Sequence, residues 1–315
     1  MMGPAADVFD RFPHGIVVCD PGGQVVAANP RARLDLVAMG AGAVGIASAP
    51  LDDDGSHVVV ELRPPAARHS VPRRLRLLTM GELRVESPDG PLSGDWLDQR
   101  PGELLRFLVC SRGRVVPTDV IAEAIWPHVG SGATNTVRQF VHALRERLEP
   151  GRPPHAASAF IECRRGGYAL RRDRVWIDAD AFEHDADEGL DALAAGEHEI
   201  ACQRLERAAA LYRDDFLRDE PYADWAFIER ERLRAVAHNV LQALVELRRD
   251  HLPAVAAYLE RLAELEPFDD DVHRQLIAVW LRLGRKSRAA RHYESLRIRL
   301  LREFGERPDF ELSEL

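Results

Sequence analysis

The sequence predicts a multidomain protein that is mainly α, with smaller α+β parts. At 315 residues the chain is longer than one ordinary domain and fits two or three. Its composition shifts at the Pro-rich stretch RPPAARHSVPRR (residues 63–74) and again near residues 175–180. Beyond the second shift Ala, Leu, Arg and Glu recur at helical spacing almost to the last residue. We therefore expect domains at 1–65, 75–175 and 176–315, with a linker at 66–74 and a nearly all-helical last domain.

Charge is distributed unevenly over these parts. The whole chain carries a formal charge of −9, but residues 1–72 carry −3, residues 73–175 carry +5 and residues 176–315 carry −11. Affinity for phosphates depends on local rather than total charge. A basic middle between acidic ends is typical of a DNA-binding part with protein-contacting neighbours.

The sequence gives no sign of a membrane segment or a metal site. No apolar run approaches the roughly 20 residues of a membrane span, and Asp7 and Asp10 stand where a secretory signal carries positive charge. We therefore expect a cytoplasmic protein without membrane contact. The four cysteines are far apart, with no C-x-x-C pair and no His at zinc spacing, so they are expected to be buried thiols.

Cofactor binding and catalysis are not expected either. Gly40, Gly42 and Gly45 match a G-x-G-x-x-G pattern, but a predicted helix precedes them where a dinucleotide site requires a strand. No G-x-x-x-x-G-K-[ST] loop occurs. The His, Asp and Glu residues are scattered, so no catalytic constellation emerges and an enzyme is not predicted.

The first domain begins with a hairpin that leads into a short helix. Residues 15–19 and 24–28 read as strands around the turn Asp20-Pro21-Gly22-Gly23, and residues 57–62 as one further strand. FPHGIVVCDPGGQVVAANPRARLDLV resembles the opening of a PAS sensor domain. The resemblance covers about residues 6–38, and the linker follows too soon for a full PAS fold. A truncated PAS-like α/β segment implies a dimerisation or docking module, or a small-molecule sensor.

Residues 75–175 predict strands followed by three helices and a second hairpin. RLRLLTMGELRVES reads as two short strands, ELLRFLVCSRG as a helix that stops at Gly113, and PTDVIAEAIWP as a helix from Pro117 to Pro127. The third helix spans residues 133–148. Its Val137, Val141, Leu144 and Leu148 recur on one face and should pack on the first two helices.

The opposite face of the third helix is polar and cationic. Asn135, Arg138, His142 and Arg145 recur on it. Arg can bond guanine and Asn or Gln can bond adenine in a major groove, although a solvated helix face is the alternative. The following AFIECRRGGYALR reads as a hairpin with Arg164 and Arg165 at its tip, suited to the minor groove or the backbone beside the helix.

These residues resemble an OmpR/PhoB-type winged helix-turn-helix, and with the last domain they resemble the Streptomyces antibiotic regulatory protein (SARP) family. The resemblance is carried by ELLRFLVCSRGRVV, EAIWP, TNTVRQFVHALRERLEP and RRGGYAL. It implies a DNA-binding set on the third helix and the wing, namely Asn135, Arg138, Gln139, His142, Arg145, Arg164, Arg165, Gly166, Gly167 and Tyr168.

The last domain reads as pairs of helices. Residues 262–305 resemble a tetratricopeptide unit, with fewer than three clear repeats visible. LYRDDFL, ADWAFIERERL and LLREFGERP resemble the bacterial transcriptional activation domain that follows the winged helix in SARPs. The resemblance implies a transcriptional activator that binds double-stranded promoter DNA and contacts RNA polymerase. It leaves open whether the protein is a homodimer. The alternatives are a regulator that responds to a signal or small-molecule effector, and a protein-interaction scaffold that has lost DNA binding.

Overall fold

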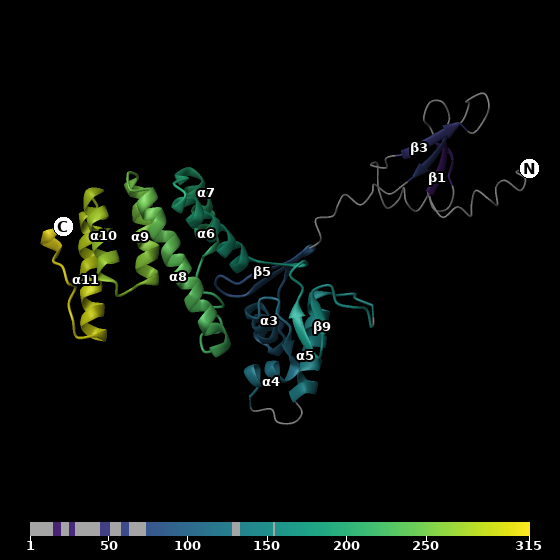
Figure 1. Ribbon diagram of the computed structural model, residues 1–315, viewed down its shortest axis with the longest axis horizontal. Helices are drawn as coiled ribbons and strands as arrows, with labels where there is room; N and C mark the ends of the chain where they lie inside the picture. The colour runs from purple at the N-terminus through teal and green to yellow at the C-terminus, as the bar shows by residue number, and fades with distance from the viewer. Residues whose placement is uncertain are drawn as a thin grey trace, which may run out of the picture. The chain divides into compact units, whose positions relative to one another are not determined.

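The computed structural model divides the chain into two compact units, residues 1–72 and 73–315. It describes residues 15–19, 25–28, 45–50, 58–62, 74–127, 133–153 and 155–315. Figure 1 labels the helices of the second unit and some of the strands of both units. The fold class is confirmed: a winged helix is joined to an all-helical part.

The described part of the first unit is a four-stranded antiparallel sheet. Its strands are β1 (Gly15–Cys19), β2 (Val25–Ala28), β3 (Gly45–Pro50) and β4 (Val58–Leu62), in the order β2-β1-β4-β3. Strand β3 was not predicted, because GIASAP consists mostly of small residues and lacks an alternation of large apolar and polar side chains. Gly45 of the G-x-G-x-x-G pattern begins this strand, whereas the expected turn and short helix lie outside the described residues.

The second unit begins with a four-stranded sheet in the order β11-β5-β6-β7. Strands β5 (Leu75–Leu78), β6 (Arg84–Ser87) and β7 (Gly90–Leu92) form an antiparallel meander, and β11 (Val175–Ile177) joins β5 in parallel. The sequence predicted the meander region but not β11. Strand β11 follows β5 by about a hundred residues in the sequence but lies beside it in the sheet. The three helices and the wing hairpin of residues 93–174 are therefore inserted between two strands that are neighbours in space.

Three helices and a small sheet complete the winged helix. Helix α3 (Arg100–Cys110) follows the short 3-10 turn η2 (Asp95–Asp98), and α4 (Thr118–Ile125) and α5 (Ala133–Leu148) come next. Strands β8 (Val116–Pro117), β9 (Ile161–Arg164) and β10 (Gly167–Leu170) form a sheet in the order β8-β10-β9. The hairpin β9-β10 is the wing.

The rest of the chain is an array of antiparallel helix pairs. Helices α6 (Asp178–Ala194) and α7 (His198–Leu211) pack together, as do α8 (Asp224–Leu247) with α9 (Leu252–Leu265) and α10 (Asp270–Arg282) with α11 (Lys286–Glu303). Each pair also packs on the next, so the helices follow one another in a row (Figure 1). The stretch that resembles a tetratricopeptide unit, residues 262–305, covers the end of α9, α10 and α11, and the paired helices predicted before it are also present.

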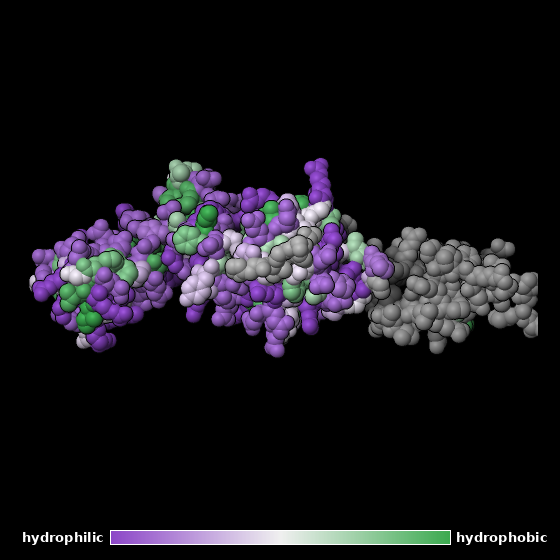
Figure 2. Space-filling model, turned by 90° about the horizontal axis from the view of Figure 1, so that it is seen from below, coloured by the Kyte–Doolittle hydropathy of each residue, from purple (hydrophilic) through white to green (hydrophobic). Residues whose placement is uncertain are grey.

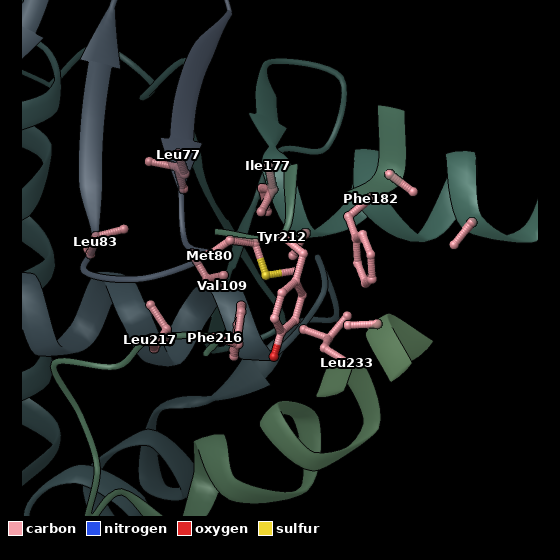
Figure 3. Packing of buried hydrophobic residues seen from close by; sticks show 14 of the residues in the cluster. Leu77, Met80, Leu83, Val109, Ile177, Phe182, Tyr212, Phe216, Leu217 and Leu233 are labelled. Atoms are coloured by element: carbon pink, nitrogen blue, oxygen red, sulfur yellow. The ribbon is translucent and has the colours of Figure 1, made fainter. Parts of the chain in front are cut away.

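One continuous core joins the winged helix to the array. Met80 from the β5–β6 turn meets Phe216 from the α7–α8 segment, beside Phe182 of α6 and Tyr212 after α7 (Figure 3). All four side chains are at least 95% buried. Backbone hydrogen bonds reinforce the contact, since Leu217 N donates to Thr79 O at 2.9 Å and Gly81 N donates to Asp215 O at 3.1 Å. The two parts therefore share their interior.

Asp178 is the central polar residue of this junction. It opens α6 and is completely buried, and its carboxylate accepts hydrogen bonds from Thr79 N at 2.6 Å, Thr79 Oγ1 at 2.7 Å and Met80 N at 3.2 Å. Arg213 adds an ion pair at 2.9 Å. The carboxylate thus satisfies donors from the winged helix and from the array, and it stands at a helix N-terminus, where negative charge is favourable.

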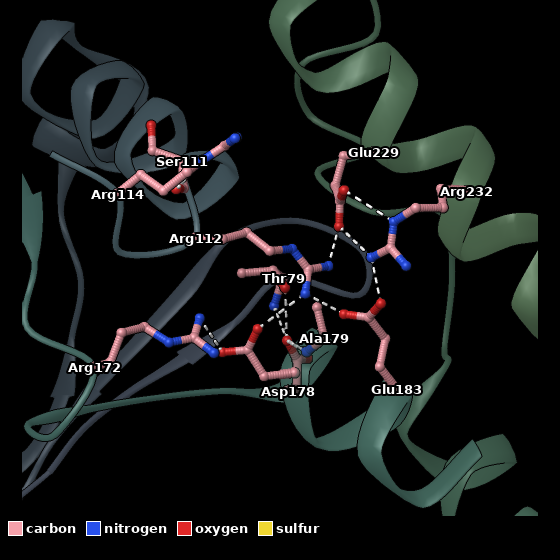
Figure 4. A network of polar contacts seen from close by, with 11 residues as sticks. Thr79, Ser111, Arg112, Arg114, Arg172, Asp178, Ala179, Glu183, Glu229 and Arg232 are labelled. Carbon is pink, nitrogen blue, oxygen red and sulfur yellow. Dashed lines mark hydrogen bonds and ion pairs between the residues drawn. The ribbon is translucent and has the colours of Figure 1, made fainter. Parts of the chain in front are cut away.

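A second polar network lies beside Asp178 (Figure 4). Arg112, after α3, pairs with Asp180 and Glu183 of α6 and with Glu229 of α8, and Arg232 pairs with Glu183 and Glu229. Partial burial alone would raise the pKa of Glu229, but hydrogen bonds from Arg232 and Arg112 outweigh it and hold that pKa below its usual value. This contribution to stability is present above the carboxyl's ordinary pKa and is lost as the pH falls through the lowered one.

Helix α3 has its own anchor on the array. Arg106 is 3% exposed, and its Nε donates to Asp219 at 2.7 Å, while Phe107 lies edge-on to Trp225 with ring centroids 5.6 Å apart. A buried arginine on α3 with its carboxylate in the α7–α8 segment fixes the orientation of α3 against α8.

Replacing Asp178 should destabilise the junction between the winged helix and the array. We expect Asp178→Ala to lower the free energy of unfolding by about 3–5 kcal/mol, because Arg213 and the donors of Thr79 and Met80 lose a buried charged partner. Urea unfolding followed by tryptophan fluorescence measures this, since all five tryptophans lie in residues 73–315. Asp187→Ala, at an exposed position of the same helix, should stay within about 0.5 kcal/mol of wild type. Equal midpoints for the two variants would contradict the role given to Asp178.

Candidate nucleic-acid interface

Helix α5 begins and ends where the sequence predicted, and its apolar face is buried. Val137, Val141, Leu144 and Leu148 are each at most 3% exposed. They pack toward α3 and α4, which contact α5. The 3.6-residue period of these four side chains therefore fixes which face of α5 is left for solvent or a ligand.

The opposite face of α5 is open to solvent. Asn135, Arg138, Gln139 and His142 are all exposed. Arg138 Nη1 donates to Asn135 Oδ1 at 3.4 Å, a long and exposed contact, so the guanidinium remains accessible. His142 Nε2 lies 3.2 Å from Glu146, an acidic residue that the sequence analysis did not include in this stripe.

Arg145 occupies a different position from the one predicted. It is half-buried: its Nη2 donates to the Ile161 carbonyl at 3.0 Å, and its guanidinium carbon lies 5.7 Å from the centre of the Tyr168 ring. Both partners belong to the wing hairpin. Arg145 therefore differs from the exposed residues of the stripe, because it joins α5 to the wing.

The tip of the wing is a two-residue turn with left-handed backbone at both positions. Arg165 has a φ of 50° and Gly166 a φ of 78°, and Arg164 pairs with Gly167 across the turn. Positive φ at both central residues is the type I′ pattern, which matches the twist of the two strands. Arg164, Arg165 and Gly166 are exposed there, and Arg165 makes no ion pair with any described residue.

Gly167 and Tyr168 lie beneath the exposed tip. A Cβ on Gly167 would stand 2.4 Å from the Val116 carbonyl oxygen, so β10 approaches β8 at a distance that only glycine permits. Tyr168 is 8% exposed, and burial raises the pKa of its phenol. Both were predicted as DNA-binding residues; the structure places them inside the wing, because the strand that carries them is covered by β8 and by Arg145.

Thr118 ties the wing to α4. It stands at the first position of α4, and both its backbone N–H, at 3.3 Å, and its Oγ1, at 2.5 Å, donate to the Gly166 carbonyl. The wing hairpin is therefore held by α4 at its turn and by Arg145 of α5 at its strands. The roles of Thr118 and Arg145 were not predicted. A Thr after a Pro reads as an ordinary helix start, and Arg145 shares the period of the outward stripe.

The segment between α5 and β9 forms a further hollow beside the helix. Glu149 accepts hydrogen bonds from Ser158 Oγ and from Ala159 N, the latter at 2.7 Å, and this closes the segment into a loop. A cavity of about 710 Å³ is lined there by His142, Arg145, Glu146, Glu149, Arg152 and His155 among others. Arg152 and His155 add basic groups next to the α5 stripe that the sequence analysis did not select.

The cysteines follow the expectation only in part. Cys202 is buried, and burial raises the pKa of the half-buried Cys110 thiol to about 12. Cys163, in the wing strand β9, is exposed, so its prediction as a buried thiol was wrong. Among the described residues no group of His, Cys, Asp and Glu is placed to hold a metal ion, and no helix is long and apolar enough to cross a membrane.

Two known families match the chain. Residues 96–170 match the C-terminal domain of transcriptional regulatory proteins, and residues 177–315 match the bacterial transcriptional activator domain. The chain is 28% identical over 224 residues to the regulatory protein DnrI of Streptomyces peucetius, covering 69% of this chain and 82% of that protein. It is also 28% identical over 246 residues to the transcriptional regulatory protein EmbR of Mycobacterium tuberculosis, covering 76% of this chain and 62% of EmbR.

The fold is likewise shared with a solved structure. Mycobacterium tuberculosis EmbR in complex with a low-affinity phosphopeptide superposes with a TM-score of 0.53 at 25% identity, covering 76% of this chain and 63% of that one. The chain thus spans less than two thirds of EmbR.

An exposed cationic helix face beside a basic wing, fused to helix pairs, defines a DNA-binding transcription regulator. Its two matched domains and its relatives show a SARP-type regulator, with the domain pair of a DNA-binding transcriptional activator.

A side chain at Gly167 should loosen the wing. We expect Gly167→Ala to destabilise the protein by roughly 1–3 kcal/mol, because its methyl group would force β10 away from β8. The urea midpoint and the hydrogen exchange of the Tyr168 and Val116 amides measure this. Gly166→Ala, whose Cβ would have open space but a strained φ, is the matched control. It should cost roughly 1–2 kcal/mol without accelerating exchange of the Val116 amide, and accelerated exchange in both variants would refute steric displacement by Gly167.

Proposed function

We propose that α5 enters the major groove of promoter DNA while the wing tip contacts the adjacent minor groove or backbone. Asn135, Arg138, Gln139 and His142 are the base- or phosphate-contacting set on the helix, and Arg164 and Arg165 the set on the wing. Gly166 supplies the turn. Arg145, Gly167 and Tyr168 support DNA binding by holding the two contact surfaces together.

The observation that carries this proposal is a pair of accessible guanidinium groups on two elements that are fixed to each other. Arg138 and Arg165 are both exposed and neither forms an ion pair with a described carboxylate. Arg145 and Thr118 fix the wing against α5 and α4. A rigid separation between two cationic contacts suits a duplex of constant groove spacing, because little conformational entropy is lost on binding.

The helical array is proposed to contact RNA polymerase and to support dimerisation. Its net charge of −11 makes it unsuited to DNA but suited to basic protein surfaces. Figure 2 shows a mostly hydrophilic surface interrupted by separate apolar groups. The exposed apolar side chains of the array include Tyr222, Phe227 and Ile228 around the start of α8, which give protein partners apolar contact area.

We further propose the division into a short PAS-like domain (1–65), a linker (66–74), the winged helix (75–175) and the activation domain (176–315). The four-stranded sheet of the first unit gives the PAS-like segment a folded basis for dimerisation or docking. Tethering two winged helices in this way would set the spacing of the half-sites. A response to a signal through this segment is the alternative that modifies the function.

Removal of Arg138 should weaken DNA binding without affecting the fold. We expect Arg138→Ala to weaken binding to the promoter by about 1–3 kcal/mol if it reads a base, and to leave the urea midpoint unchanged because the side chain is exposed. Fluorescence anisotropy on genomic DNA fragments over a salt series measures both affinity and salt slope. Arg147→Ala is the matched control: it removes the same charge from an exposed position on the other side of α5.

The two arginine variants decide between functions. Equal losses in Arg138→Ala and Arg147→Ala would contradict a directed recognition face on α5. Absence of DNA binding by the folded wild-type protein at low salt would favour the protein-interaction scaffold.

At the wing tip one substitution can remove a positive charge without lowering the stability of the protein. Asn tolerates the left-handed conformation of position 165 better than Arg does, and Asn-Gly is the preferred type I′ pair. We therefore expect Arg165→Asn to keep or slightly raise the urea midpoint while lowering the salt slope of DNA binding by about 1. An unchanged salt slope would place the wing tip away from the phosphates.

A further inference from the structure

A cavity lies within the helical array, away from the DNA-binding elements. It has a volume of about 430 Å³ and is formed by α9, α10 and α11. Its lining combines apolar side chains, such as Leu276 and Ala263, with charged and polar groups, including Glu260, Glu264, Arg288, His292 and Arg299. A small organic molecule would fit this volume.

Arg299 is an unpartnered cation in this lining. Its Nε is buried and has no hydrogen-bond partner, and none of its nitrogens forms an ion pair or hydrogen bond with another described residue. Arg145 and Arg152 also have a buried, unbonded Nε, but each donates to a backbone carbonyl through another nitrogen. A half-buried guanidinium without any acceptor indicates a site for an anionic group.

Two histidines fix a hydrogen-bond acceptor in the same cavity. His273 Nε2 lies 3.1 Å from the Pro267 carbonyl, which can only accept, so this nitrogen carries the proton. His273 Nδ1 must then accept, at 2.8 Å, from His292 Nε2. His292 is consequently left with an unprotonated Nδ1, and burial keeps the ring neutral by lowering its pKa to about 4. Among the described residues nothing donates to this nitrogen.

The other charged groups of the lining are one ion pair, Glu260 with Arg288, and one carboxylate, Glu264, which lies near Arg261. Glu260 accepts from Trp280 Nε1 at 3.3 Å and pairs with Arg288 at 2.9 Å, and Arg288 lies over the Trp280 ring. Glu264, in contrast, is exposed at the rim and accepts no hydrogen bond from a described residue. Among the described residues the lining thus offers one cation without an ion pair or hydrogen bond, Arg299, and two acceptors that receive no hydrogen bond, His292 Nδ1 and Glu264.

We propose that this cavity binds a small amino or hydroxy acid, with its carboxylate on Arg299 and its ammonium or hydroxyl group donating to His292 Nδ1. Glu264 favours the ammonium form from the rim. The ligand would connect α11 with α9 and α10 and so stabilise the last helix pair. The inference rests on the proposed function only in regarding the chain as a regulator whose helical array receives an effector.

Calorimetric titration of the full chain with glycine, alanine, glutamate, lactate and malate tests the site, with acetate and inorganic phosphate as anions that lack an amino group or an adjacent hydroxyl. We expect at least one amino or hydroxy acid to bind and to raise the melting temperature by roughly 5 °C at saturation. Arg299→Gln should weaken that binding tenfold or more, by roughly the strength of a charge-assisted hydrogen bond. Arg291→Gln, at an exposed position of the same helix and outside the cavity lining, should bind like wild type.

Glu264→Gln is a second variant. Because Glu264 is exposed, this substitution should leave the fold intact, and it should weaken the binding of amino acids more than that of hydroxy acids. Failure of every probe to bind, or binding by Arg299→Gln equal to wild type, overturns the proposal. Acetate or phosphate binding as tightly as the best acid overturns the assigned ligand class. Promoter affinity is measured on the same proteins without ligand, so a failed site with intact DNA binding is distinguished from a failed function.

Discussion

The arrangement of the second unit depends on one buried carboxylate. Asp178 stands where strand β11 becomes helix α6, and it collects donors from Thr79 and Met80 at the β5–β6 turn and from Arg213 after α7. A buried charge is tolerated only with nearly complete hydrogen bonding. The β5–β6 turn, the first turn of α6 and the α7–α8 segment must therefore reach their native positions together. The apolar contact of Met80 with Phe216 follows from that geometry (Figure 3).

This junction makes the winged helix and the array one body. Arg106 with Asp219, Phe107 with Trp225, and the network around Arg112 all join the end of α3 to the array (Figure 4). A flexible linker would leave the direction of the array independent of the bound DNA, whereas a shared core fixes it. Since α3 packs on α5, the proposed docking of α5 on a promoter would determine where the array stands. A change in the array can reach α5 through α3 and the β5–β6 turn, and it can reach the wing through the ion pair of Arg172 with Asp180 of α6.

Short-range patterns predicted much of this structure. The bounds and the two faces of α5 followed from a 3.6-residue period, and the wing followed from Gly166-Gly167 between two strand-like runs. The features that were not predicted depend on residues that are distant in the sequence. Strand β11 has only three residues, and Asp178 reads as an ordinary acidic residue in a first helical turn. Arg145 shares the period of the outward stripe, yet Ile161 and Tyr168 draw it into the wing. The sequence also did not distinguish the two glycines of the wing. Gly166 forms the turn, whereas Gly167 is buried because its strand approaches Val116 closely.

The charge distribution explains how an acidic protein is able to bind DNA. At physiological ionic strength the electrostatic field of an exposed charge decays over about 8 Å, so the array's −11 acts on phosphates only if it lies close to them. Asp178 and the Arg112 network join the array to the β5–β6 turn and to the end of α3, whereas the α5 stripe lies on the face of α5 opposite to the one that packs on α3. Many of the array's carboxylates are also neutralised internally, as Glu183 and Glu229 are by Arg112 and Arg232. The guanidinium groups of Arg138 and Arg165 have no such partners and retain their full charge for an external anion. The same ion pairs that make the second unit rigid therefore reduce the repulsion of its acidic part from DNA.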